Sequence, residues 1–149
     1  MPKLLCLDYG EKRVGVAVAE QEARLAFPRA ALFKTTRKNF FAGLAALIRE
    51  EAPSAIVLGL PVRQDGAESL TARRVRNFAR SLRRAFDLPL YFMDETLSSA
   101  EAKMLLRESG QKPYMRDGRV DSLAAVKILE SFLRLAPEKR HAVVEAKAQ

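Results

Sequence analysis

The chain has 149 residues, of which 48% are hydrophobic and 30% charged, a composition typical of one globular domain. The 26 Lys and Arg residues outnumber the 18 Asp and Glu residues, and the net charge of +8 favours an anionic partner, nucleic acid first. The apolar runs are far shorter than the roughly 18 residues of a membrane span, and no secretion signal is visible at the N-terminus, so we expect a cytoplasmic protein without membrane contact.

The first third of the chain predicts three antiparallel strands followed by a helix. Apolar runs at residues 3–8 and 14–19 flank a short polar segment, which predicts a β-hairpin, and residues 30–33 predict a third strand. From Thr36, which can cap a helix, apolar residues recur at helical spacing up to Pro53.

The rest of the chain predicts an alternation of strands and helices. Strands are expected at residues 55–58 and 90–93, and helices at about residues 68–86, 98–108 and 121–136. This order predicts an α/β fold with a mixed five-stranded sheet, antiparallel hairpin strands first and parallel strands after, flanked by helices. We expect residues 1–136 to form one domain and residues 137–149 a weakly ordered polar tail.

Three acidic residues stand at the ends of these elements. Asp8 ends the first strand, Glu95 follows the strand at residues 90–93, and Asp121 opens the last helix. Because ligands gather at the carboxyl ends of parallel strands, we expect Asp8 and Glu95 to share one edge, joined by Asp121. Three converging carboxylates repel one another and call for a cation such as Mg²⁺ or Mn²⁺, and two such ions suit phosphodiester hydrolysis.

Each acid also has a purely structural interpretation. Asp8 precedes Tyr9 and Gly10 and can initiate a turn, whereas Asp121 can serve as an ordinary helix N-cap. Asp94 and Glu95 together can belong to a surface loop, although side chains of adjacent strand residues point to opposite faces. The local sequence leaves these alternatives open.

Other catalytic chemistries lack their residues. The single histidine, His141, lies in the polar tail, which excludes His-containing zinc sites and Ser-His or Cys-His pairs. The single cysteine, Cys6, lies in an apolar run, which predicts a buried thiol without redox chemistry.

The helix expected at residues 68–86 carries a basic face opposite its apolar face. Five residues form this arginine stripe: Arg73, Arg76, Arg80, Arg83 and Arg84. Such a face is usually a solvated helix surface. The segment from the first to the last of these arginines contains no acid, however, so binding to phosphates would relieve the repulsion among them.

Residues 7–18 (LDYGEKRVGVAV) resemble the opening segment of the YqgF family, RuvC-like members of the ribonuclease-H-like superfamily. Three further segments match the family in the same order, at residues 57–66, 94–102 and 118–133. The matches span residues 7–133, nearly the whole chain.

The resemblance implies a ribonuclease-H-like fold and a cytoplasmic nuclease that acts on structured nucleic acid, either precursor rRNA or branched DNA. By motif, Asp8, Glu95 and Asp121 match the catalytic, metal-binding acids of the family, with Mg²⁺ or Mn²⁺ as cofactor. We favour 5′-end processing of pre-16S rRNA in ribosome biogenesis, with ribosomal particles as further partners, over resolution of Holliday junctions. The protein is then a monomer or a homodimer, since symmetric cutting of a junction calls for a dimer.

Basic residues are expected to hold the nucleic acid. Lys12 and Arg13 match the basic pair of the family's first hairpin. The remaining candidates lie in the arginine stripe and in a basic loop: Arg73, Arg76, Arg80, Lys112, Arg116 and Arg119. Thr96 departs from the family pattern, because many relatives carry Arg directly after the Asp-Glu pair, and Arg116 or Arg119 can compensate for the missing charge.

Two other functions fit parts of the sequence. The segment of Asp8 to Gly10 with its hairpin also resembles the phosphate loop of actin-like ATPases, although those proteins use two such domains. A noncatalytic rRNA-binding module would use the arginine stripe and have no need of the acids.

Overall fold

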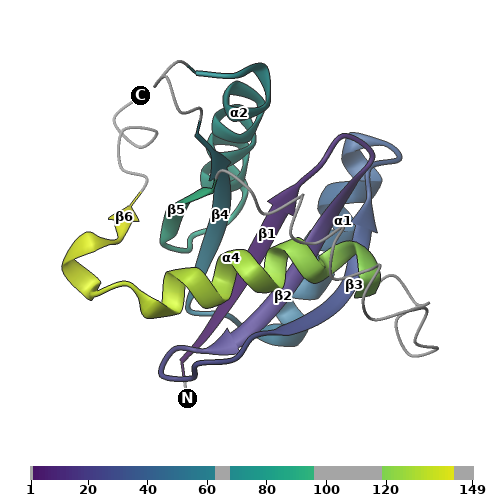
Figure 1. Cartoon of the computed structure of the whole chain (residues 1–149). Coiled ribbons are helices and arrows are strands. Elements are labelled where there is room, and N and C mark those ends of the chain that lie inside the picture. Colours follow the sequence, from purple (N-terminus) through teal and green to yellow (C-terminus); the bar gives the residue numbers. More distant parts are fainter. Residues whose placement is uncertain (1, 63–67, 96–118, 143–149) are drawn as a thin grey trace.

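The structure is a computed structural model that describes residues 2–62, 68–95 and 119–142, a six-stranded sheet with helices on both faces (Figure 1). The strands are β1 (Lys3–Tyr9), β2 (Arg13–Glu20), β3 (Phe27–Phe33), β4 (Ala55–Pro61), β5 (Leu90–Glu95) and β6 (His141–Ala142). The helices are α1 (Arg37–Glu51), α2 (Leu70–Ala85) and α4 (Leu123–Arg134), with short 3₁₀ helices η2 (Arg119–Ser122) and η3 (Pro137–Lys139).

The strands lie in the order β3-β2-β1-β4-β5-β6. β1, β2 and β3 are antiparallel neighbours, whereas β1, β4 and β5 run parallel, so the carboxyl ends of these last three strands meet at one edge of the sheet. The predicted mixed five-stranded sheet is confirmed. β6 adds a sixth, two-residue strand beside β5, within the segment expected to be a tail, and the helix expected at residues 98–108 lies outside the described residues.

Local sequence explains where the first two helices begin. The Thr36 hydroxyl accepts a hydrogen bond from the Asn39 backbone N–H at the start of α1, and Ser69 does the same for Ala72 at the start of α2. Each cap satisfies a backbone donor that has no partner within the helix. Both starts lie within two residues of the predicted positions.

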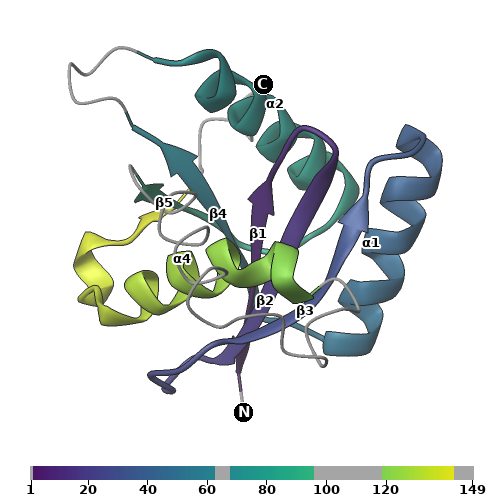
Figure 2. The same ribbon diagram turned by 45° about the vertical axis from the view of Figure 1, so that its right-hand side comes forward.

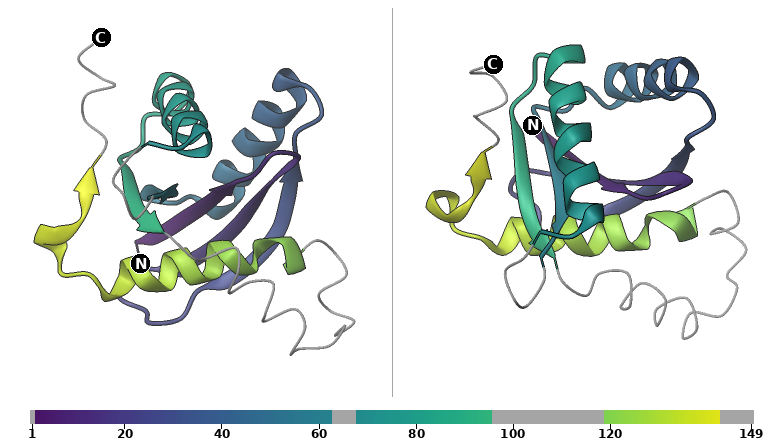
Figure 3. Two further views of the ribbon diagram at one scale, coloured as in Figure 1. Left: turned by 45° about the horizontal axis from the view of Figure 1, so that its top comes forward. Right: turned by 90° about the horizontal axis from the view of Figure 1, so that it is seen from above.

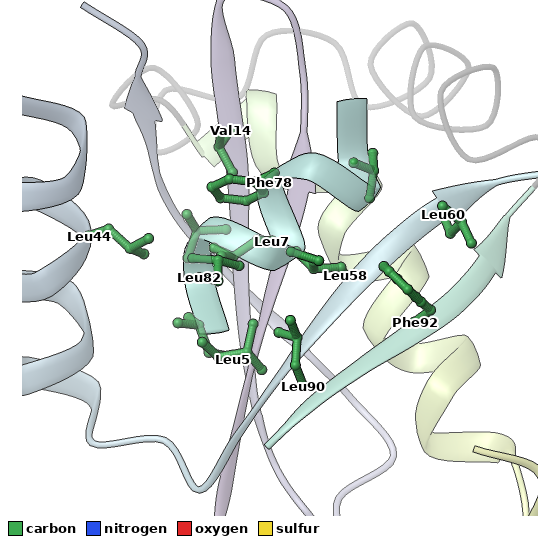
Figure 4. Close-up of a cluster of buried hydrophobic side chains, with 14 of the residues drawn as sticks. Leu5, Leu7, Val14, Leu44, Leu58, Leu60, Phe78, Leu82, Leu90 and Phe92 are labelled. Carbon is green, nitrogen blue, oxygen red and sulfur yellow. The ribbon is translucent and has the colours of Figure 1, made fainter. Parts of the chain in front are cut away.

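The sheet separates two hydrophobic clusters, and Figure 3 shows α1 and α2 on one face and α4 on the other. The larger cluster joins alternate residues of the central strands, such as Leu5, Leu7 and Leu58, to the apolar sides of α1 and α2 (Figure 4). The smaller cluster packs α4, through Ile128 and Phe132, against the opposite face. The hydrophobic cluster to which a strand residue belongs therefore shows which face of the sheet its side chain occupies.

The face covered by α4 is closely packed. A Cβ atom at Gly59 would lie 2.6 Å from Ile128 Cδ1, so α4 contacts the backbone of β4 directly. Cys6 is fully buried on this face, as expected, and burial together with the nearby charge of Asp8 raises the pKa of its thiol well above the usual value. Among the helices that the structure describes, none has the length and apolar character needed to cross a membrane.

Candidate functional site

The position of Asp8 follows from the alternation of side chains along β1. Leu5 and Leu7 belong to the cluster under α1 and α2, whereas Leu4 and Cys6 belong to the cluster under α4. Asp8 therefore lies on the face that carries α4, near the carboxyl end of the strand. The turn interpretation is wrong for Asp8, because it pairs with Gly15 within the ladder and the hairpin is closed by the Gly10 N–H donating to the Arg13 carbonyl at 3.0 Å.

Glu95 reaches the same face from β5. Leu90 and Phe92 pack under α1 and α2, while Tyr91 and Met93 pack against the α4 cluster, so the alternation places Glu95 on the α4 side. Its neighbour Asp94 falls on the other face and is exposed. The parallel pairing of β1, β4 and β5 brings Asp8 and Glu95 to one edge of the sheet, as predicted.

Asp121 is held over this face by η2. The Ser122 hydroxyl is fully buried, accepts a hydrogen bond from the Val16 N–H at 2.9 Å and donates one to the Arg29 carbonyl at 2.6 Å. These bonds fix η2 across β2 and β3. The N-cap interpretation of Asp121 is wrong, because Ser122 occupies the N-cap position of α4 and the Asp121 side chain pairs with Arg13 instead.

Gly15 allows η2 to approach the backbone of β2 closely. A Cβ atom at Gly15 would lie 2.7 Å from the Asp121 carbonyl oxygen, a distance that no side chain tolerates. Gly15 is also the residue of β2 that pairs with Asp8. The Asp121 backbone therefore lies against the position next to Asp8 in the sheet, and the three acids occupy one face.

The Asp121 carboxylate is bound by a neighbouring cation. Arg13 Nη1 donates to Asp121 Oδ2 at 2.9 Å, and the Arg13 guanidinium lies 5.3 Å from the centre of the Phe33 ring. We expected the carboxylates to call for a metal cation and Arg13 to hold the nucleic acid, so this ion pair was not predicted. It neutralises part of the acidic charge and leaves Arg13, a predicted phosphate contact, engaged with the protein itself.

Asp8 and Glu95 interact electrostatically. Burial raises the pKa of Asp8 to about 6, and the charge of Glu95 adds to the rise. Two carboxylates in this situation suit a divalent cation, because a cation stabilises both in their ionised form. Within residues 2–62, 68–95 and 119–142, no three His, Cys, Asp or Glu side chains are grouped so that they could hold a metal ion. The donor set fits a cation at Asp8 and Glu95, with Asp121 close by but bound to Arg13.

Unlike the three acids, the predicted basic residues do not share one face of the sheet. Lys12 is exposed in the hairpin loop, and the arginine stripe lies on α2, on the opposite face from the acids. Arg76 is not free of acids, because its Nε donates to Glu68 at 2.7 Å, and Arg80 bonds to Asn77. Lys112, Arg116 and Thr96 lie outside the described residues, as does the side chain of Arg119.

Sequence reasoning missed the residues that assemble the site. Gly15, Ser122 and the role of Arg13 toward Asp121 depend on contacts between segments about 100 residues apart. No local signal marks these contacts. The only hint was that Gly15 and Ser122 both fall within the family-like motifs.

A family model described as "RuvX: Holliday junction resolvase" matches residues 2–135. The chain belongs to the RuvX family. Proteins named "Putative pre-16S rRNA nuclease" from two strains of Nitratidesulfovibrio vulgaris, DP4 and Miyazaki F, are 47% and 49% identical to it over 138 residues. The alignments cover 93% of this chain and 97% and 96% of those proteins. This confirms the resemblance to YqgF proteins, and the names of the relatives support a hydrolase acting on phosphodiester bonds.

A solved structure supports the RuvX fold assignment. The chain is similar to Thermus thermophilus RuvC in complex with a Holliday junction substrate, with a TM-score of 0.53 and 13% identity, over 96% of this chain and all of that one. At this identity the likeness concerns the fold alone, and it confirms the predicted ribonuclease-H-like architecture.

The docking of η2 can be tested with two glycine substitutions. Gly15→Ala should lower the free energy of unfolding by roughly 1–3 kcal/mol, because the added methyl forces η2 away from β2. Gly43→Ala is the matched control: its Cβ would make ordinary contact, 3.7 Å from Leu32 Cδ2, and alanine stabilises a helix interior by up to about 1 kcal/mol. Urea unfolding of both variants measures the difference, and equal effects would refute the close approach.

The raised pKa of Asp8 predicts a pH-dependent effect of Asp8→Asn. Asp8 holds its proton more tightly in the folded state than in the unfolded chain, so stability is lost as the pH rises from about 4 through 6. Asparagine cannot ionise. In EDTA, Asp8→Asn should therefore be more stable than the wild type at pH 7.5, by up to about 3 kcal/mol, and close to it at pH 4.

Urea unfolding at the two pH values measures this effect. Asp94→Asn, which removes an exposed carboxylate at the end of β5 on the other face of the sheet, is the matched control and should lose stability between pH 4 and pH 7.5 as the wild type does. A gain in Asp8→Asn that is equal at both pH values would contradict the account.

Proposed function

We propose that this RuvX protein is a metal-dependent nuclease that hydrolyses phosphodiester bonds in structured nucleic acid, with the 5′ end of pre-16S rRNA as its physiological substrate. The observation that carries the proposal is the placement of Asp8, Glu95 and Asp121 on one face of the sheet. The names of relatives that align with 93% of the chain support the choice of substrate. A net charge of +8 suits a polyanionic substrate.

The proposed cofactor is Mg²⁺ or Mn²⁺. Asp8 and Glu95 would hold the cation, and Asp121 would join them by exchanging its bond with Arg13. When bound, such ions activate water as a nucleophile and stabilise the leaving oxygen.

The chain's own residues prepare this site. Partial burial of Asp8 raises the pKa of its carboxyl group, and the bonds of Ser122 orient the backbone that carries Asp121. Once released by Asp121, Arg13 is free to bind a phosphate of the substrate, and exposed Lys12 lies in the same hairpin. We propose that Arg119, which begins η2, and the residues of the basic loop, Lys112 and Arg116, contribute further phosphate contacts.

Resolution of a Holliday junction is the second candidate, because the matching family model carries that description. The two substrates differ in their demand on symmetry: paired cuts in a junction call for a homodimer, whereas trimming one rRNA end does not. A single cleavage experiment can include both substrates, the precursor rRNA and the DNA junction.

Cleavage of labelled precursor 16S rRNA and of a four-way DNA junction tests the proposal. The wild type should cut the RNA in Mg²⁺ or Mn²⁺ and not in EDTA, and Asp8→Asn should lower the rate by at least roughly 100-fold, as removal of a transition-state-stabilising group does. Asp94→Asn, on the opposite face, should retain activity.

The outcomes separate the candidate functions. Preferential metal-dependent cutting of the junction would replace the rRNA substrate with DNA. Equal activity of Asp8→Asn and the wild type would refute the carboxylate site, and tight binding without any cutting would favour a noncatalytic rRNA-binding module.

A further inference from the structure

A cavity lies on the face of the sheet opposite the acids. It has a volume of about 680 Å³ and is enclosed by the β1–β2 hairpin, the start of α1 and one side of α2. Figure 2 shows the hairpin between these two helices. The volume falls within the range of about 300–1,000 Å³ found for small-molecule and cofactor sites.

The floor of this cavity is aromatic. The Tyr9 and Phe78 rings lie 4.4 Å apart between centroids, and Phe40 and Phe41 extend the cluster on the α1 side. Two cations cover these rings: Lys34 Nζ lies 4.0 Å from the centre of Tyr9, and the Arg37 guanidinium 4.9 Å from that of Phe41. Phe40 and Phe78 are buried, whereas Tyr9 and Phe41 are partly exposed and offer a stacking surface for a nucleobase.

The rim of the cavity is basic. Lys34, Arg37 and Arg74 line it, against one acid, Glu11. Arg37 donates to the Ser81 hydroxyl at 3.2 Å. Arg74 is exposed and has no hydrogen-bond or ion-pair partner among residues 2–62, 68–95 and 119–142. The cavity therefore presents an uncompensated guanidinium beside its aromatic floor.

The amino-terminal end of α1 adds to the positive potential. Thr36, the N-cap of α1, and Arg37 line the cavity, so α1 opens onto it with its amino-terminal end, whereas α2 lines it with one side. The first turn of α1 contains no acid, and the helix begins with Arg37 and Lys38. Cations at the positive end of a helix are unfavourable, and an anion bound there relieves the repulsion.

We propose that this cavity binds one unpaired nucleotide of the nucleic-acid substrate, with the base on the aromatic floor and a phosphate facing Arg37 and Arg74. The base takes the place of Lys34 and Arg37 over the rings, and these cations turn to the phosphate. Asp8 and Tyr9 are consecutive residues that face opposite sides of the sheet, so a strand that passes over the hairpin reaches both the acids and this cavity. The inference rests on the proposed nuclease function, and it names single-stranded flanks as the substrate feature that the protein recognises.

Binding in EDTA tests the inference separately from cleavage. The probe is a fluorescent single-stranded RNA hexamer, measured by anisotropy with full-length protein that carries Asp8→Asn in every case. Adding Arg74→Ala should weaken binding about tenfold, the expected loss of a charged hydrogen-bonding partner. Adding Arg49→Ala, which removes an exposed arginine at the far end of α1, should leave it unchanged. Thermal unfolding checks that both variants are folded.

Two further probes define the ligand. A matched abasic hexamer should bind at least roughly tenfold more weakly, because base stacking is lost. AMP should compete poorly if the site serves a strand of substrate. Equal losses from Arg74→Ala and Arg49→Ala, or equal binding of the abasic hexamer, would overturn the inference. Tight AMP binding would assign the cavity to a free nucleotide instead of the substrate strand.

Failure here and failure of the proposed function give different results. If the nuclease proposal fails, either the wild type cuts neither substrate or Asp8→Asn leaves cleavage intact, whatever the result of hexamer binding. If only the proposed nucleotide binding in the cavity fails, cleavage still depends on Asp8, whereas Arg74→Ala leaves hexamer binding unchanged.

Discussion

The pairing of β1 is the interaction on which the other features depend. β1 is antiparallel to β2 and parallel to β4, which places the hairpin and the carboxyl ends of β1, β4 and β5 at one edge of the sheet. The alternation of side chains then sends Asp8 toward α4 and Tyr9 toward α1 and α2. A shift of one residue in this register would exchange the two faces and bury the acid in the larger hydrophobic cluster.

Bringing acids together at this edge is unfavourable without a ligand, and the rest of the site offsets part of the cost. Asp8 is held in an environment that opposes its ionisation. Asp121 is compensated by Arg13, and η2 is anchored through Ser122 and the absence of a side chain at Gly15. Asp121 is thus kept in place by the Arg13 ion pair, the Ser122 hydroxyl and the close backbone approach at Gly15, and such preorganisation is typical of sites for a charged ligand.

Much of the fold could be predicted from the sequence, because strand alternation and helix periodicity are local signals. The strands at Asp8 and Glu95 and the helices capped by Thr36 and Ser69 appear close to their expected positions. The strand at His141 was missed because two residues in a polar segment give no periodic pattern. The ion pair of Arg13 with Asp121 and the cavity beside Arg74 could not be predicted, since each depends on segments far apart in the sequence and on the packing of helices against the sheet.

We propose that Asp8 and Glu95, joined by Asp121 once it leaves Arg13, bind a divalent cation on the α4 face, and paramagnetic Mn²⁺ tests this site directly. In ¹⁵N-labelled protein, substoichiometric Mn²⁺ should first broaden the backbone amide signals of Asp8, Glu95 and Asp121. The signals of Asn77 and Ser81, in the cavity on the opposite face, should persist, and Asp8→Asn should abolish the selective broadening. Broadening that begins elsewhere, or that is unchanged in Asp8→Asn, would contradict the account.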